Sequence, residues 1–163
     1  MDFAIFHNLA LGFSVALTLQ NLMYCFFGVL LGTLIGVLPG IGPLATIAML
    51  LPITFTLPPI AALIMLAGIY YGAQYGGSTT AILVNIPGES SSVITCLDGY
   101  QMVRQGRAGP ALAIAAIGSF FAGSVATVVI ALFAPPLAEV ALKFGPAEYF
   151  SLMILGLIGA VVL

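Results

Sequence analysis

The feature that most constrains this chain is a long stretch without charge. From Phe3 to Gly88 it contains no Asp, Glu, Lys or Arg, and such a run exceeds several-fold the roughly 20 apolar residues that one helix needs to cross a bilayer. Of the 163 residues, 62% are hydrophobic and 5% are charged, whereas soluble domains carry about 25% charged residues. Backbone polar groups in lipid must be satisfied within the chain. The sequence therefore predicts an all-α, polytopic integral membrane protein surrounded by the lipid bilayer.

The few charged groups exclude several classes of function. Arg104, Arg107 and Lys143 make no basic patch, so we expect no nucleic acid as a partner. His7 has no His, Cys or carboxylate at metal-ligand spacing, so no metal site is predicted. A Walker lysine and a nucleophile elbow are both missing from the sequence, and we expect the protein not to be an enzyme.

Glycines at a spacing of four mark the first predicted helix, residues 9–38. Gly28, Gly32 and Gly36 fall on one face of it, and Gly40 continues the spacing past the expected helix end. Helices in lipid associate by close approach over small residues. We expect another element to cross tightly on this face, the alternative being a helix that is merely rich in glycine.

Proline and glycine predict a broken-helix hairpin over residues 39–88. The run Pro39 to Pro43 should end the first helix and start a short one, residues 44–57. A further helix, residues 60–75, should end at a second break, the pair Gly76-Gly77 with the hydroxyls of Ser78 to Thr80.

Helix breaks at membrane depth are typical of transporter binding sites. Irregular backbone survives there only when it is buried in protein or lines a wet cavity, and a helix N-terminus with free N–H groups suits a carboxylate. Freed carbonyls suit a small cation such as Na⁺. The blander alternative is that the hydroxyls bond back to their own helix and that the breaks are simple turns. The candidate residues are Pro39, Gly40, Ile41, Gly42, Pro43, Gly76, Gly77, Ser78, Thr79, Thr80, Asn85, Pro87 and Gly88.

The second half predicts a polar loop followed by more membrane helix. Residues 89–109 form the loop, with Glu89 as a helix cap or solvent-facing group rather than a proton-linked one. A transmembrane helix over 110–134 should stop at Pro135-Pro136, and Glu139 with Lys143 should pair at i,i+4 in the link that follows. Residues 149–163 look like the start of a further transmembrane helix. We therefore expect residues 1–163 to be one transmembrane domain, truncated at its C-terminal end.

Four runs of residues resemble a known family. They are Gly36–Pro43 (GVLPGIGP), Ala67–Ser78 (AGIYYGAQYGGS), Asn85–Gly88 (NIPG) and Leu97–Tyr100 (LDGY). Together they closely resemble the large membrane subunit of tripartite tricarboxylate transporters, the TctA family, over most of the chain.

The resemblance implies one half of an inverted-repeat secondary transporter in the bacterial inner membrane, with multiple passes. It implies uptake of citrate or another organic carboxylate anion, driven by a Na⁺ or H⁺ gradient without a further cofactor. The implied partners are a small membrane subunit and a periplasmic solute-binding protein. Carried over residue by residue, the substrate region is Pro39–Pro43 and Gly76–Thr80, with Asn85–Gly88 beside it. The alternative function is a channel-like or structural membrane subunit without its own substrate site.

Overall fold

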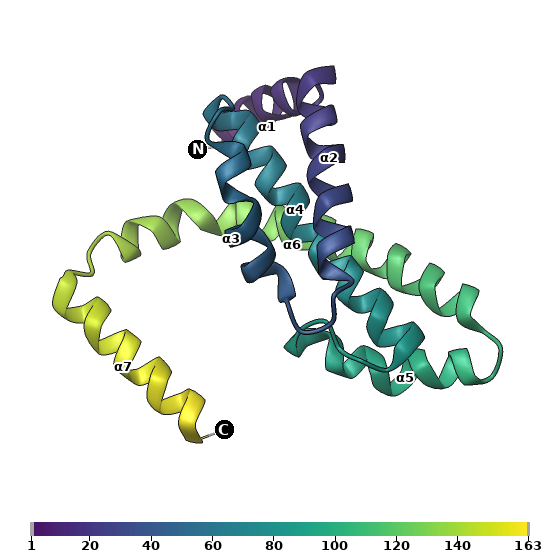
Figure 1. Ribbon diagram of the computed structural model, residues 1–163. Coiled ribbons are helices and arrows are strands. Elements are labelled where there is room, and N and C mark those ends of the chain that lie inside the picture. The colour runs from purple at the N-terminus through teal and green to yellow at the C-terminus, as the bar shows by residue number, and fades with distance from the viewer. Residues whose placement is uncertain (1, 163) are drawn as a thin grey trace. The chain divides into compact units, whose positions relative to one another are not determined.

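The chain folds into helices joined by short connections. The structure is a computed structural model that describes residues 2–162 (Figure 1). Its elements are α1 (Asp2–Ala16), α2 (Leu19–Gly36), α3 (Gly42–Thr54), α4 (Pro59–Val84), the 3₁₀ turn η1 (Ser90–Ser92), α5 (Val93–Arg104), α6 (Ala108–Ala141) and α7 (Pro146–Val162). The described residues contain no β-strand, which confirms the predicted all-α class. One compact unit ends at Ala116 and a second begins at Ile117.

Glycines form the contact between α2 and α4, which lie side by side in the first unit (Figure 1). A Cβ added to Gly68 would lie 2.7 Å from the Cys25 carbonyl oxygen, and one added to Gly76 would lie 2.6 Å from that of Thr33. Real side chains do not approach so closely, so the two backbones touch directly. Six buried glycines share this contact: Gly28, Gly32, Gly36, Gly68, Gly72 and Gly76. The predicted tight crossing is confirmed, and α4 is the crossing element.

Side chains complete the packing around α4. Leu50 of α3 packs against Met65 and Ile69 of α4 in a small buried core. On α5, Gly99 lies so close to α4 that an added Cβ would be 2.8 Å from Cγ1 of Ile82. Helix α4 thus contacts α2, α3 and α5 and is the central helix of the first unit.

The predicted first helix, residues 9–38, is two helices in the structure. Thr18, between α1 and α2, has an extended backbone with φ −62° and ψ 141°. The Thr18 hydroxyl and the Asn21 amide both donate to the carbonyl of Val15, at 2.9 Å and 2.8 Å. Such local side-chain bonds compete with the helical ladder, so the helix ends here.

The predicted second break at Gly76-Gly77 is wrong, because α4 runs without interruption from Pro59 to Val84. The glycines serve close packing instead of a turn: an added Cβ at Gly77 would lie 3.2 Å from Cα of Gly88. Helix α4 ends later, at Asn85, whose backbone is left-handed with φ 61°.

The predicted helix end at Ala134 is also wrong, since α6 continues through Pro135 and Pro136 to Ala141. Proline lacks the backbone N–H that a helix uses as a donor, but its fixed φ angle is compatible with a helix. The helix therefore continues, with fewer backbone hydrogen bonds. Lys143 therefore lies beyond the helix, and its predicted helical pairing with Glu139 does not form in this arrangement.

Among residues 2–162, two helices are long and apolar enough to cross a membrane, Leu19–Gly36 and Ala108–Ala134. Large apolar side chains are also widely exposed, for example Phe120 at 78% and Leu44 at 79%. An apolar surface of this extent needs lipid or another apolar partner, and with the uncharged first half of the chain it identifies an all-α membrane protein.

Candidate functional site

The turn between α2 and α3 is the predicted first break. Helix α2 ends at Gly36 and α3 begins at Gly42. Gly40 and Gly42 have positive φ angles of 79° and 67°, a backbone region that favours glycine. Pro43, in the first turn of α3, is buried, and its missing N–H costs nothing at that position. The break over Pro39–Pro43 is confirmed as a break in the helix.

The chain after α4 folds back onto the helix that it leaves. The left-handed Asn85 reverses the direction of the chain, and Gly88 then comes so close to Gly77 that an added Cβ would overlap the Gly77 backbone. Pro87 is half-buried and Gly88 is buried. Asn85 was predicted as a polar site residue, and in the structure its backbone conformation forms the turn.

Three segments that are distant in sequence meet at four glycines, which we call the glycine junction: Gly36, Gly42, Gly77 and Gly88. A Cβ on Gly77 would lie 3.2 Å from Gly88 Cα and 3.8 Å from the Gly36 carbonyl oxygen. A Cβ on Gly42 would lie 3.9 Å from the Gly88 carbonyl oxygen. The junction therefore brings together the first break, the C-terminal third of α4 and the segment Asn85–Gly88.

Some predicted residues lie away from the junction. Pro39 and Gly40 are exposed at the tip of the turn, and an added Cβ on Gly40 meets nothing within 4 Å. Gly36 belongs to the junction but was predicted only as a packing glycine. Its place one helical turn before Gly40, in the same glycine series, was the available signal.

The hydroxyls near the junction divide into two kinds. Thr80 donates to the carbonyls of Gly76 and Gly77 at 3.2 Å and 3.0 Å, and Thr79 donates to Tyr75 at 2.9 Å. Thr46 of α3 likewise donates to the Gly42 carbonyl at 2.8 Å. For these threonines the structure confirms the alternative expectation, in which each hydroxyl bonds to a carbonyl of its own helix. Ser78 is half-buried and, within the described part of the chain, forms no such bond.

Backbone donors complete the chemistry of the junction. The first turn of a helix leaves its N–H groups without intrahelical acceptors, which here concerns Gly42 and Leu44 of α3. The positive end of the α3 dipole adds about half a unit charge at the same place. Neutral and dipolar groups of this kind suit a carboxylate.

Glu89 is the carboxylate next to the junction, and it acts as a cap. Its side chain accepts the N3 backbone N–H of η1, while the Ser92 hydroxyl accepts from the Glu89 N–H at 3.2 Å. The Ser91 hydroxyl also donates to Oε1 of Glu89 at 2.6 Å. This reciprocal capping box satisfies the carboxylate locally, which agrees with the predicted capping role.

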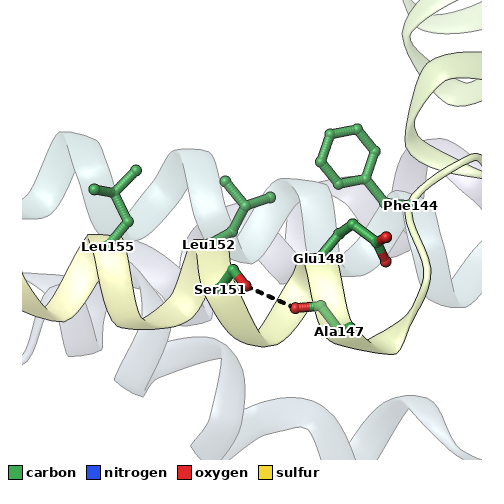
Figure 2. A pocket seen from close by; sticks show the side chains of 6 residues that line it. All are labelled: Phe144, Ala147, Glu148, Ser151, Leu152 and Leu155. Carbon is green, nitrogen blue, oxygen red and sulfur yellow. Dashed lines mark hydrogen bonds between the residues drawn. The ribbon is translucent and has the colours of Figure 1, made fainter.

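A separate hollow of about 370 Å³ lies on the second unit, at the start of α7. Figure 2 shows its lining, which is Phe144, Ala147, Glu148, Ser151, Leu152 and Leu155. The Ser151 hydroxyl is used in a bond to the Ala147 carbonyl at 2.9 Å. The remaining polar group is the carboxylate of Glu148. None of these residues was predicted as part of a site.

Metal binding has no support among the residues described, because they contain no group of three or more His, Cys, Asp or Glu that could hold an ion. The cysteines Cys25 and Cys96 are both free.

Comparison with known proteins gives one family and one relative. Residues 22–163 match the tripartite tricarboxylate transporter TctA family. An uncharacterised 52.8 kDa protein in the TAR-I ttuC' 3' region of Agrobacterium vitis is 73% identical over 151 residues, which cover 93% of this chain and 30% of that protein. The chain thus spans about a third of the length of this relative. No solved structure matches the chain. The family match covers most of the sequence, from the first turn of α2 to the last residue, and the chain belongs to the tripartite tricarboxylate transporter TctA family.

Proposed function

We propose that this chain forms part of the membrane subunit of an ion-gradient-driven carrier for organic carboxylates, of the tricarboxylate or citrate type. The carrier works with a small membrane subunit and a periplasmic solute-binding protein, and it crosses the bacterial inner membrane several times. It carries no enzymatic activity and uses Na⁺ or H⁺ as its coupling ion. The observation that supports a substrate site in this chain is the glycine junction, where three separate segments present backbone to one point.

The binding chemistry rests on one helix break and one helix end instead of two breaks. The N–H groups of Gly42 and Leu44 point from the first turn of α3, and Ser78 supplies a hydroxyl from α4. Donors fixed by the backbone bind a carboxylate without a buried positive charge. Glycine at Gly77 and Gly88 lets these two backbones touch, which brings the segment Asn85–Gly88 beside the first turn of α3. The coupling cation balances the charge of the anion, with helix C-terminal carbonyls such as those at the end of α2 as its ligands.

Ser78→Ala tests this site in the complete carrier. Removal of a hydrogen bond to a charged group costs about 1.5–3 kcal/mol, so we expect KM for carboxylate uptake to rise about tenfold or more. The matched control is Thr80→Val, because the Thr80 hydroxyl is used inside α4. Uptake kinetics are measured in cells with a panel of labelled dicarboxylates and tricarboxylates. Wild-type KM in Ser78→Ala would remove Ser78 from the site.

Two substitutions of Asn85 distinguish a role of its backbone in the turn from a role of its side-chain amide in substrate binding. Asn85→Ala should reduce uptake, because an L-residue other than Asn or Gly pays about 1–2 kcal/mol in the left-handed region. Asn85→Gly keeps the turn and removes the amide. Restored uptake in Asn85→Gly would assign the turn, and not the side chain, to the function; equal loss in both variants would assign the amide to the substrate.

Ion dependence distinguishes a carrier from a channel-like or structural subunit. We expect saturable uptake by the complete carrier that stops when the Na⁺ and H⁺ gradients are collapsed. Uptake that follows the carboxylate gradient alone, or that persists without this chain, would contradict the proposed function.

A further inference from the structure

Within the first unit, α2 and α3 pack along α4 and α5 packs on its last turns at Ile82; the stripe of α4 before Ile82 that they leave uncovered is its open side. The glycines of α4 face α2, Met65 and Ile69 face α3, and Ile82 meets α5. The open side carries the exposed residues of the helix, so its composition shows what this side is made to contact.

The open side changes from apolar to polar along the helix. Near the start of α4, Ile60 and Leu63 are 56% and 67% exposed and suit lipid. From the third turn on, the same side carries five polar side chains, which we call the tyrosine face. The tyrosine face consists of Tyr70, Tyr71, Gln74, Tyr75 and Ser78. Helical spacing places these residues on one face, and each of the three tyrosines is between 37% and 52% exposed.

The polar groups of the tyrosine face are largely unused by the protein. Gln74 Nε2 donates to the Tyr70 hydroxyl at 3.1 Å, which leaves that hydroxyl free to donate in turn. Within residues 2–162, no hydrogen bond forms from the hydroxyls of Tyr71, Tyr75 or Ser78. The threonines on the covered sides of α2 and α4 differ, since Thr33 and Thr79 donate to carbonyls one turn earlier.

Unused donors are costly against lipid. An unsatisfied polar group costs several kcal/mol in hydrocarbon, and a tyrosine belt at the membrane surface would not include Gln74 and Ser78. The face also spans nine residues, Tyr70 to Ser78, or about 12 Å along the helix axis, which is too deep for a belt one ring thick. The tyrosine face is therefore unsuited to lipid, and it suits water, a polar ligand or polar groups of another protein segment.

The chemistry of the face favours an anion. It offers hydroxyl and amide donors and contains no carboxylate. It also leads to the glycine junction, because Ser78 directly follows Gly77. A carboxylate moving along this side of α4 would meet donors on successive turns before it reaches the N–H groups of α3.

We propose that the tyrosine face lines the wet route by which the carboxylate reaches the glycine junction, with Tyr71, Gln74 and Tyr75 as substrate-binding residues. This inference rests on the proposed function, because it names further residues of the same site.

Thiol labelling in the complete carrier tests whether the face is wet. In a background without other cysteines, with Cys25→Ala and Cys96→Ala, the variants are Tyr71→Cys, Tyr75→Cys and the control Leu63→Cys. The control lies on the same side of α4, two turns before Tyr71. We expect an anionic, membrane-impermeant methanethiosulfonate to label the first two and not the control, and citrate to slow this labelling. Labelling equal to that of the control, or labelling that carboxylates do not slow, would overturn the inference.

Removal of single hydroxyls tests whether the face binds substrate. We expect Tyr71→Phe and Tyr75→Phe to raise KM for uptake by about tenfold, as for a lost hydrogen bond to a charged ligand, with kcat less affected. The control is Tyr24→Phe on α2, where the ring packs against the core. An unchanged KM in both Tyr71→Phe and Tyr75→Phe would overturn the inference. The proposed function would still stand as long as the wild type takes up carboxylate. Absence of carboxylate uptake by the wild type would contradict the proposed function, and labelling of the face would still be measured independently.

Discussion

Glycines have different surroundings in two regions of the chain: in the α2–α4 pair they are packed against backbone, whereas glycines of α6 and α7 such as Gly118 face open space. In the α2–α4 pair, an added Cβ on Gly68 or Gly76 would come within 3 Å of the backbone of the other helix. In α6 and α7, an added Cβ on Gly118, Gly156 or Gly159 would meet nothing within 4 Å. The difference teaches that glycine content alone does not predict close packing. The series Gly28, Gly32 and Gly36 at a spacing of four did predict a tight crossing, and the structure adds the matching series Gly68, Gly72 and Gly76 of α4.

The largest effect is expected from Gly72→Ala, at the centre of the α2–α4 contact. The new methyl would overlap the Val29 carbonyl oxygen and lie 2.8 Å from the Thr33 nitrogen. Backbone cannot rotate away as a side chain does, so we expect a loss of about 3 kcal/mol in the free energy of unfolding. The measurement is thermal unfolding and the monodisperse fraction in detergent. Wild-type stability would show that the two helices are not in direct contact.

An intermediate effect is expected from Gly88→Ala, where a loop instead of a helix meets Gly77. The methyl would overlap Cα of Gly77, but the loop is able to shift, so the loss of stability should be smaller, about 1 kcal/mol. We expect uptake to fall by more than the loss of folded protein explains, because the shift of the loop opens the glycine junction. Uptake kinetics and unfolding are compared in the same preparation. A large loss of stability with normal uptake per folded protein would separate the junction from the function.

The smallest effect is expected from Gly118→Ala in α6. With open space around the added methyl, the substitution should be neutral or should gain up to about 1 kcal/mol, because alanine is the better helix former. It is measured by thermal unfolding, beside Gly72→Ala. A clear loss of stability that occurs only in the assembled carrier would reveal a partner helix packed on α6 there.

The sequence predicted the helix break correctly where proline and glycine combine and at the proline pair between α3 and α4, and wrongly at the glycine pair of α4 and at the proline pair of α6. Pro39, Gly40 and Gly42 together require a turn, and the turn exists. Gly76 and Gly77 were interpreted as a turn, but a glycine pair also permits close packing. In the structure both glycines lie inside α4 and pack against other backbone. Pro135 and Pro136 did not stop α6; each removes one helical hydrogen bond, but the fixed φ of proline itself is compatible with a helix. The break at Thr18 depends on the Thr18 and Asn21 side chains, which both donate to the Val15 carbonyl in place of helical N–H groups. A Thr and an Asn three residues apart are too common in sequences to predict such a break.

The candidate site was predictable in its parts but not in its assembly. The segments around Gly42, Gly77 and Asn85 were each recognised from local chemistry. Their meeting point depends on which element crosses α2 and on the reversal at Asn85. The glycine spacing predicted a tight crossing but not its partner, and the reversal at Asn85 leaves no periodic signal. The free and back-bonded hydroxyls of Ser78 and Thr80 also look alike in sequence. Only the helix geometry separates them, since it sets which face each occupies.

The direct backbone contact of α2 with α4 has a mechanical consequence. Side chains between two helices normally yield by changing rotamer when the helices slide or tilt, but glycine has no rotamers to change. The pair should therefore behave as one stiff strut during transport. Motion in the first unit would then fall to elements that join α4 through ordinary side chains, and α3, with Leu50 against Met65 and Ile69, is such an element.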